Sequence, residues 1–151
     1  MSEAVEIPLP ALLRHARTTY GAAMRRALAE AGFDDVPRNG PHIIGGLALG
    51  AGDVPLGQLV RELRTSKQAA GQLVDMLVGR GYLERAVDAE DRRRLKITLT
   101  ERGRAAASVQ TDARRTVDDA LEARIGAEGV ARLREGLVVL VDMGMEDGRV
   151  G

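Results

Sequence analysis

The chain of 151 residues contains no cysteine and no tryptophan, and its aromatic residues are one phenylalanine and two tyrosines. Without cysteine it cannot form disulfides, bind a metal through thiolates or sense peroxide through a thiol. The two histidines, His15 and His42, are isolated in the sequence and have no metal-ligand spacing. It has no signal peptide and no apolar run of about 20 residues, so we expect a cytoplasmic location.

The sequence also lacks the common motifs of enzymes. It has no glycine-rich phosphate loop, no histidine and cysteine nucleophile pair and no metal-binding motif. Its carboxylates are scattered over segments with helical periodicity, where solvated faces are far commoner than acid–base pairs. We therefore expect a protein that binds rather than catalyses, without a cofactor.

The net charge is zero, but the basic residues are unevenly distributed. Residues 55–104 contain 11 Lys and Arg against 7 Asp and Glu, net +4, whereas the remainder contains 11 against 15, net −4. A local basic excess of this kind is the electrostatic footprint expected of a nucleic-acid-binding segment. The length and the 44% hydrophobic content suit a single compact domain, residues 1–151.

Residues 55–80 have the pattern of two short helices joined by a turn. In 55–63 the apolar residues repeat at helical spacing, and Pro55 suits a helix start. After a break at 64–65, Thr65 or Ser66 can cap a second helix, which runs to about Arg80 and ends at Gly81. Its expected outer face carries Lys67, Gln68, Gly71, Gln72 and Asp75.

Two glutamines dominate this outer face. Gln68 and Gln72 are four residues apart and therefore share one side of the helix, where glutamine can bind adenine bidentately in a major groove. Gly71 costs roughly 1 kcal/mol of helix stability relative to alanine, but it allows a helix backbone to approach DNA. An ordinary polar helix face would also contain such residues, and this alternative stays open.

Residues 81–104 predict a two-stranded hairpin. The alternating segments Tyr82–Val87 and Leu95–Leu99 flank a charged tip, Asp88–Arg94, that contains three consecutive arginines. Arginines at the tip of a hairpin can reach a nucleic-acid backbone or groove, whereas the alternative is a solvated turn. The alternation places one apolar set on a common face: Leu83, Val87, Leu95, Ile97 and Leu99.

These motifs resemble those of the MarR family of bacterial transcriptional regulators. The run Asp91-x-Arg93-x-x-x-Ile97-x-Leu99-Thr100-x-x-Gly103 resembles the family's wing signature. Leu73-Val-Asp-Met-Leu77, followed by Gly81-Tyr-Leu-Glu-Arg85, is similar to the end of its recognition helix and its first wing strand. The match covers residues 55–104. One departure is Ala89-Glu90, where many members have proline followed by a variable residue, and it affects only the wing turn.

The resemblance implies a homodimer that binds a pseudo-palindromic operator in double-stranded DNA. Each subunit would place Ser66–Arg80 in a major groove and its wing beside the minor groove, with Asp91 bracing the wing by pairing with an arginine. The sequence does not decide which arginine pairs and which contacts DNA. The implied DNA-binding residues are Ser66, Lys67, Gln68, Gly71, Gln72, Arg92, Arg93 and Arg94.

The resemblance also implies a small-molecule effector, often aromatic or phenolic, that binds between the dimer helices and the DNA-binding lobe and weakens operator binding. Candidate residues that could line its site, or could equally belong to the core, are Tyr20, Met24, His42 and Ile43.

The flanking segments predict the dimerisation helices, 9–32 and 101–145, around a DNA-binding lobe at 41–100. The later helical segment has a narrow apolar stripe and is interrupted at Gly126 and Gly129. Such a stripe is buried poorly by one chain, so we expect pairing with a second subunit; the alternative is a monomeric helical bundle.

Taken with the resemblance, these patterns predict a mainly α fold with a small β wing. The predicted function is a homodimeric, sequence-specific DNA-binding transcriptional regulator, most simply a repressor. The alternative is a winged helix that binds an acidic protein partner, which a duplex-DNA footprint or the salt dependence of binding would distinguish.

Overall fold

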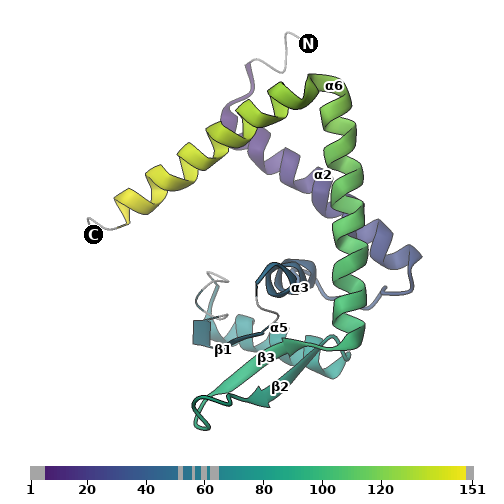
Figure 1. Ribbon diagram of the computed structural model, residues 1–151, viewed down its shortest axis with the longest axis vertical. Helices are drawn as coiled ribbons and strands as arrows, with labels where there is room; N and C mark the ends of the chain where they lie inside the picture. The colour runs from purple at the N-terminus through teal and green to yellow at the C-terminus, as the bar shows by residue number, and fades with distance from the viewer. Residues whose placement is uncertain (1–5, 51–52, 56, 59–60, 62–64, 149–151) are drawn as a thin grey trace. The chain divides into compact units, whose positions relative to one another are not determined.

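The computed structural model describes residues 6–50, 53–55, 57–58, 61 and 65–148 (Figure 1). The chain divides into two compact units, residues 1–114 and 115–151, which we describe separately. The first unit contains the helices α2, α3 and α5, the beginning of α6 and a small sheet. The predicted fold class, mainly α with a small β wing, is confirmed. Within the described residues, no helix is both long and apolar enough to cross a membrane.

Two helices precede the sheet. Helix α2, Leu9–Glu30, follows Pro8 and has a second proline in its first turn. It ends where Gly32 adopts a φ of +89°, which lets the Phe33 N–H donate to the Leu28 carbonyl at 2.7 Å. Helix α3, Gly40–Leu49, buries Ile43, Ile44 and Leu47 in the core of the first unit.

Helix α5, Lys67–Gly79, has the cap and the buried face that the sequence predicts. Ser66, rather than Thr65, is its N-cap, because the Ser66 hydroxyl accepts a hydrogen bond from the Ala69 N–H at 3.1 Å. After the helix, Gly81 adopts a φ of +83°, which directs the chain into the sheet. The inward side chains repeat at helical spacing and are buried: Ala70, Leu73, Val74 and Leu77.

The sheet has three antiparallel strands in the order β1-β3-β2, one more than predicted. Strands β2, Leu83–Val87, and β3, Leu95–Leu99, form the predicted hairpin; we call residues 83–99 the wing. Strand β1, Asp53–Pro55, pairs with the other edge of β3. The prediction that Pro55 begins a helix is therefore wrong: it ends an edge strand, a position that tolerates proline.

The first helix of the predicted pair lies largely outside the described residues. Gly57, Gln58 and Arg61 are helical, whereas positions 56, 59–60 and 62–63 are not described. The helical residues Gly57, Gln58 and Arg61 fall within the predicted range 55–63, whereas Pro55 belongs to β1.

Only the base of the wing packs on the core. Leu83, Ile97 and Leu99 are at most 5% exposed, as their alternation predicts. Val87 and Leu95 lie opposite each other near the tip and are 59% and 47% exposed, so the prediction of one continuous buried face is wrong there. The tip extends beyond the helices that cover the base of the hairpin (Figure 1).

Helix α6, Glu101–Asp147, starts in close contact with the sheet. The Thr100 hydroxyl accepts a hydrogen bond from the Gly103 N–H at 3.0 Å and donates to the Gly81 carbonyl. A Cβ atom at Gly103 would lie 2.1 Å from the Tyr82 carbonyl oxygen, so only glycine fits. This packing explains why the wing-like run of the sequence ends in threonine and glycine.

The second unit consists of the later part of α6. Gly126 has non-helical angles, φ +80° and ψ 164°, at one of the two predicted interruptions, whereas Gly129 lies within the helix. Beyond Gly129, large apolar side chains are exposed in the single chain: Leu133, Leu137, Val138, Val139, Leu140, Val141, Met143 and Met145.

Candidate nucleic-acid interface

The outer face of α5 presents the polar residues that the sequence singles out. Lys67, Gln68, Gln72 and Asp75 are exposed, and no described atom outside the helix's own backbone lies within 4 Å of the position that a Cβ at Gly71 would occupy. The helix backbone is therefore approachable between the two glutamines. Met76, 41% exposed one turn after Gln72, adds an apolar surface that the sequence analysis did not identify.

The tip of the wing presents three exposed arginines around Asp91. The Asp91 carboxylate lies 3.5 Å from Arg93 Nε and 3.6 Å from Arg94 Nε, and it accepts the Arg93 N–H at 3.1 Å. The Arg93 and Arg94 side chains are nevertheless 93% and 66% exposed. Arg92 is exposed and forms no ion pair within the described part of the chain. Arg93 and Arg94 therefore each pair with Asp91 and still present a guanidinium group that is accessible from outside.

A buried carboxylate supports the base of this tip. Asp88 is 7% exposed, accepts the Glu90 N–H at 2.9 Å and lies 3.6 Å from Lys96 Nζ. The Glu90 hydrogen bond, aided by the charge of Lys96, outweighs burial and holds the pKa of Asp88 below its ordinary value. The sequence analysis missed Asp88 because it reads as one more charge in a charged turn.

The wing and α5 are connected by an ion pair. Arg85 of β2 pairs with Asp75 on the outer face of α5. Asp75 therefore neutralises part of the helix face, while the pair fixes the strand beside the helix. Both residues are partly exposed, so we assign the pair a positioning role rather than a large contribution to stability.

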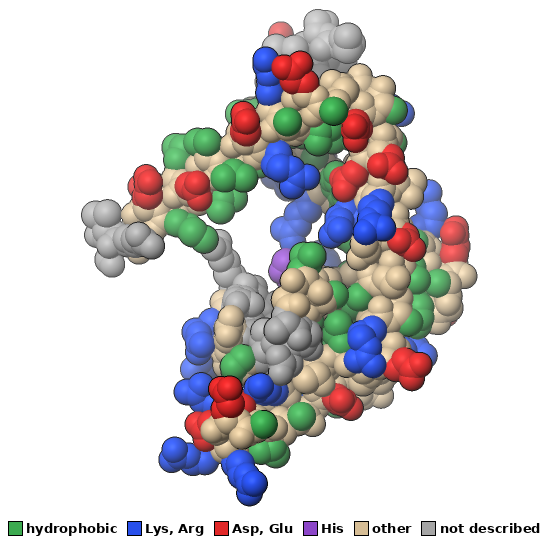
Figure 2. Space-filling view, in the orientation of Figure 1, with side chains coloured by type: hydrophobic (Ala, Val, Ile, Leu, Met, Phe, Trp, Pro, Cys, Tyr) green, Lys and Arg blue, Asp and Glu red, His purple; other side chains and the backbone are tan. Residues whose placement is uncertain are grey.

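Between α5 and the wing lies a groove of about 810 Å³ with a basic lining. Among the described residues that line it, none carries a carboxylate. Figure 2 shows Lys and Arg side chains gathered over β1 and the tip of the wing. Sequence reasoning identified Lys67, Arg93 and Arg94 as cations of the site, and the structure adds two more. The five cations of the basic groove are Arg61, Lys67, Arg85, Arg93 and Arg94.

A second cluster holds the far end of α5 in place. The Tyr82 hydroxyl donates to the Asp35 carboxylate, Arg102 Nη2 lies 2.9 Å from that carboxylate, and Arg80 Nη1 donates to the Asp35 carbonyl at 2.6 Å. The Arg102 guanidinium also lies 4.6 Å from the centre of the Tyr82 ring, and Phe33 contacts that ring edge-on. We call Asp35, Tyr82 and Arg102 the Asp35 joint; it connects the α2–α3 loop, the end of α5 and the start of α6.

The charges within the joint stabilise one another. The Tyr82 hydrogen bond, with Arg102, lowers the pKa of Asp35 against the effect of burial. Burial, and then the Asp35 carboxylate, raise the pKa of Tyr82, so the phenol stays protonated. The hydrogen bond to Tyr82 raises the pKa of Arg102. No local sequence signal could identify this joint, because its members are 20 to 67 residues apart.

None of the four candidate effector residues lines the basic groove. Tyr20 and Met24 are half-buried on α2, and His42 is exposed at the start of α3. Ile43 is 1% exposed and belongs to the hydrophobic core. The effector stays a prediction, and Ile43 would reach it only after a rearrangement of the core.

A sequence comparison matches part of the first unit to a known protein family. Residues 35–94 match the MarR family. The match includes the α2–α3 loop, α3, α5 and most of the wing. The match therefore confirms, over residues 35–94, the family resemblance that the wing signature indicates. No curated protein gives a significant sequence match.

Several solved structures share the fold over most of the chain. MarR from E. coli in its reduced form has a TM-score of 0.70 at 21% identity, covering 89% of this chain and 96% of that chain. FabT from Streptococcus pneumoniae, solved in complex with DNA, has a TM-score of 0.71 at 22% identity, covering 93% and 99%. RV1404 from Mycobacterium tuberculosis has a TM-score of 0.69 at 24% identity, covering 89% and 90%. Since each of these structures covers 89% or more of this chain, the shared fold includes the helices on both sides of residues 35–94.

Proposed function

We propose that this MarR-family chain is a sequence-specific double-stranded DNA-binding transcriptional regulator, acting as a repressor. The observation that carries the proposal is the arrangement of the exposed face of α5, the basic groove and the arginine-bearing wing on one lobe. An α-helix such as α5 fits into the major groove of DNA, and the basic groove of the protein beside it suits the phosphates that flank the major groove.

The solved relatives support the same assignment. A mutant of E. coli MarR is complexed with operator DNA, and FabT is in complex with DNA. Both share the fold that presents α5 and the wing together, at TM-scores of 0.70 and 0.71. In our proposal the chain uses this face for DNA rather than for an acidic protein.

The residues divide by the chemistry that they offer. Gln68 and Gln72 provide amides that match the N6 and N7 edge of adenine, so we assign them to base reading. Lys67 and the wing arginines provide charge, so we assign them to phosphates, with an arginine of the wing beside the minor groove. Gly71 provides space for close approach of the helix.

Gln72→Ala tests the base-reading assignment. On an operator obtained by in vitro selection, we expect the variant to lose about 1–3 kcal/mol of binding free energy and its preference at one base pair per half-site. Binding to random-sequence duplex should barely change, because glutamine releases no counterions. Affinities on both duplexes can be measured by fluorescence anisotropy.

Gln72 is exposed, so thermal unfolding of the variant should match that of the wild type and serves as the control for folding. An equal loss on operator and random duplex would refute base reading by Gln72. Failure of the wild-type protein to protect any duplex in a footprint would refute DNA binding itself and favour an acidic protein partner.

We further propose that the functional form is a homodimer. Leu133, Leu137 and Leu140 repeat at helical spacing in the second unit and are 36–46% exposed, within a run of exposed apolar residues. Exposed apolar surface of this extent marks an interface, and two-fold pairing would also present two DNA-binding lobes to a pseudo-palindromic site.

Light scattering at micromolar concentration should give twice the chain mass of 16.2 kDa. Replacing Leu137 and Leu140 with glutamate should dissociate the dimer, because two charges would be buried in the interface. Glu135→Gln, on the same helix, is the matched control and should remain dimeric. A monomer mass for the wild-type protein would exclude the dimer and the two-half-site mode.

A further inference from the structure

Met76 is a large apolar side chain on the outer face of α5. It is 41% exposed, whereas the other large apolar residues of this helix are buried or half-buried. Helical periodicity places Met76 in one row with Gln68 and Gln72, at successive intervals of four residues. The row therefore combines two amides, which can hydrogen-bond a base, with one apolar group, which cannot.

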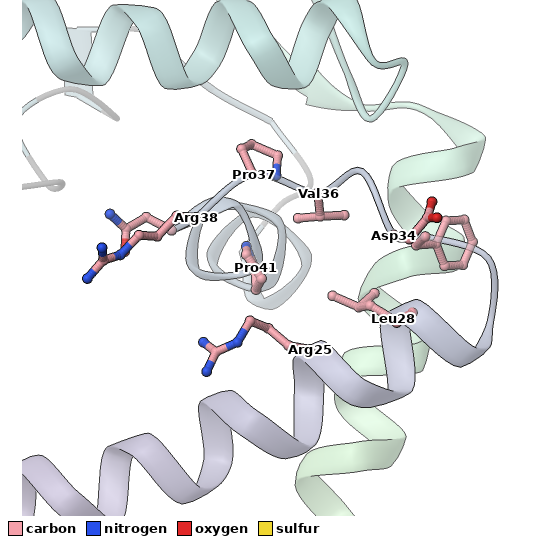
Figure 3. Close-up of a pocket in the computed structure, with 10 residues that line it drawn as sticks. Arg25, Leu28, Asp34, Val36, Pro37, Arg38 and Pro41 are labelled. Atoms are coloured by element: carbon pink, nitrogen blue, oxygen red, sulfur yellow. The ribbon is translucent and has the colours of Figure 1, made fainter.

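The residue best placed to cover Met76 is held elsewhere. Side chains in a helix lean toward its N-terminus, and the apolar stem of an arginine can cover neighbouring apolar surface, so this residue is Arg80, one turn later. Arg80 Nη1 instead donates to the Asp35 carbonyl at 2.6 Å. Asp35 lies in the α2–α3 loop between Asp34 and Val36, which line a pocket of the first unit (Figure 3). The loop thus retains the guanidinium, and Met76 stays accessible.

Met76 lies on the edge of the outer face that points away from the basic groove. The α5 residues that line the groove are Lys67, Gly71 and Val74, and Met76 is not among them. At about 100° of rotation per residue, Met76 and these three residues fall on opposite sides of Gln72. The groove that suits phosphates and the apolar side chain therefore flank the row of amides from opposite sides, and Met76 has no charge to offer a phosphate.

The apolar group that a major groove offers is the C5-methyl group of thymine. Contact with this methyl group removes apolar surface from water, and the flexible, polarisable methionine side chain adapts well to such a contact. Four residues of a helix rise about 6 Å, which is less than two base-pair steps of about 3.4 Å. When Gln72 contacts an adenine, Met76 is therefore within reach of a thymine close to it.

We propose that Met76 is a specificity-determining residue that recognises one thymine of each operator half-site through its C5-methyl group. This thymine lies within two base pairs of the adenine assigned to Gln72. The inference rests on the proposed function and adds to it an apolar contact that neither glutamine can make. The operator obtained by in vitro selection should accordingly contain a fixed thymine at such a position.

Replacement of single thymines by deoxyuridine in the selected operator tests the proposal, because deoxyuridine pairs with adenine in the same way but lacks the methyl group. At the expected position, replacement in one half-site should weaken binding of the wild-type protein about fourfold, the effect of losing one buried methyl group. Met76→Ala should bind the two duplexes with equal affinity. Met76→Leu, which keeps an apolar side chain of similar volume, should retain the preference for thymine. Fluorescence anisotropy on both duplexes completes the double-mutant cycle.

Leu49→Ala is the matched control, because Leu49 is an apolar residue of the same unit that is 78% exposed at the end of α3. It should keep the full preference for thymine. A wild-type protein that binds the operator but responds to none of the deoxyuridine replacements would overturn the proposal and leave the proposed function intact. A Met76→Ala variant that keeps the preference, or an operator without a thymine at that position, would do the same. Failure of the wild-type protein to bind any duplex would overturn both.

Discussion

Replacing both Arg93 and Arg94 with glutamine should weaken binding to a random-sequence duplex at about 0.1 M salt by roughly a hundredfold for each subunit of the proposed dimer whose wing contacts the duplex. Each phosphate contact contributes about −0.9 to the slope of log affinity against log salt, so each lost contact costs roughly tenfold at this concentration. The slope itself should decrease in magnitude by about 2 for each such subunit, and therefore by about 4 when both wings of a dimer contact the duplex. Anisotropy titrations at several salt concentrations measure both quantities.

The structure explains why these two arginines are available. Their distances to Asp91, 3.5 and 3.6 Å, are those of ion pairs rather than hydrogen bonds, and both side chains remain mostly exposed. Asp91 can therefore orient the guanidiniums without retaining them. Arg14 and Arg17 are exposed on α2, outside the lobe, so their double glutamine variant is the charge-matched control. A wild-type slope in the Arg93 and Arg94 variant would show that the wing does not contact phosphates.

Gly103→Ala should lower the free energy of unfolding by about 1–3 kcal/mol. The new methyl group would lie 2.1 Å from the Tyr82 carbonyl oxygen and 3.0 Å from Leu99 Cδ2. The contact with a backbone oxygen cannot be relieved by rotating a side chain, so α6 must shift from the sheet. Urea unfolding followed by circular dichroism measures the change.

Gly46→Ala is the control for the general effect of alanine in a helix. Gly46 lies within α3, and no described atom outside the helix's own backbone is found within 4 Å of the position that its added methyl group would occupy. The substitution should therefore stabilise the protein by up to about 1 kcal/mol. If Gly103→Ala changes the stability by less than about 0.5 kcal/mol, the close approach of α6 to Tyr82 does not exist in solution.

The features predicted from the sequence are those that depend on near neighbours in the chain. The cap at Thr65 or Ser66, the helix that follows it and the two strands of the hairpin follow from helical spacing, strand alternation and one hydroxyl. The exposed positions of Gln68 and Gln72 follow from the same helical periodicity, because a residue's face is fixed once the helix is placed. Their role in base reading remains a prediction.

The features that were missed depend on distant segments. Strand β1 has three residues, too few for alternation to show, and it exists because the edge of β3 is available. Val87 alternates correctly but is exposed, because none of the described elements covers that end of the hairpin. Asp35 and Arg102 read as surface charges, and only the fold brings them to Tyr82.

The scarcity of aromatic residues makes the Asp35 joint directly observable. The chain has two tyrosines, and only Tyr82 lies within the joint. Biosynthetic incorporation of 3-fluorotyrosine would therefore introduce two fluorine nuclei per chain, whose resonances a Tyr20→Phe variant would assign. The chemical shift of the Tyr82 fluorine would report the electric field of Asp35 and Arg102 at the end of α5. Since nucleic acid contains no fluorine, this resonance could be followed without background while the protein is bound to a duplex of any sequence.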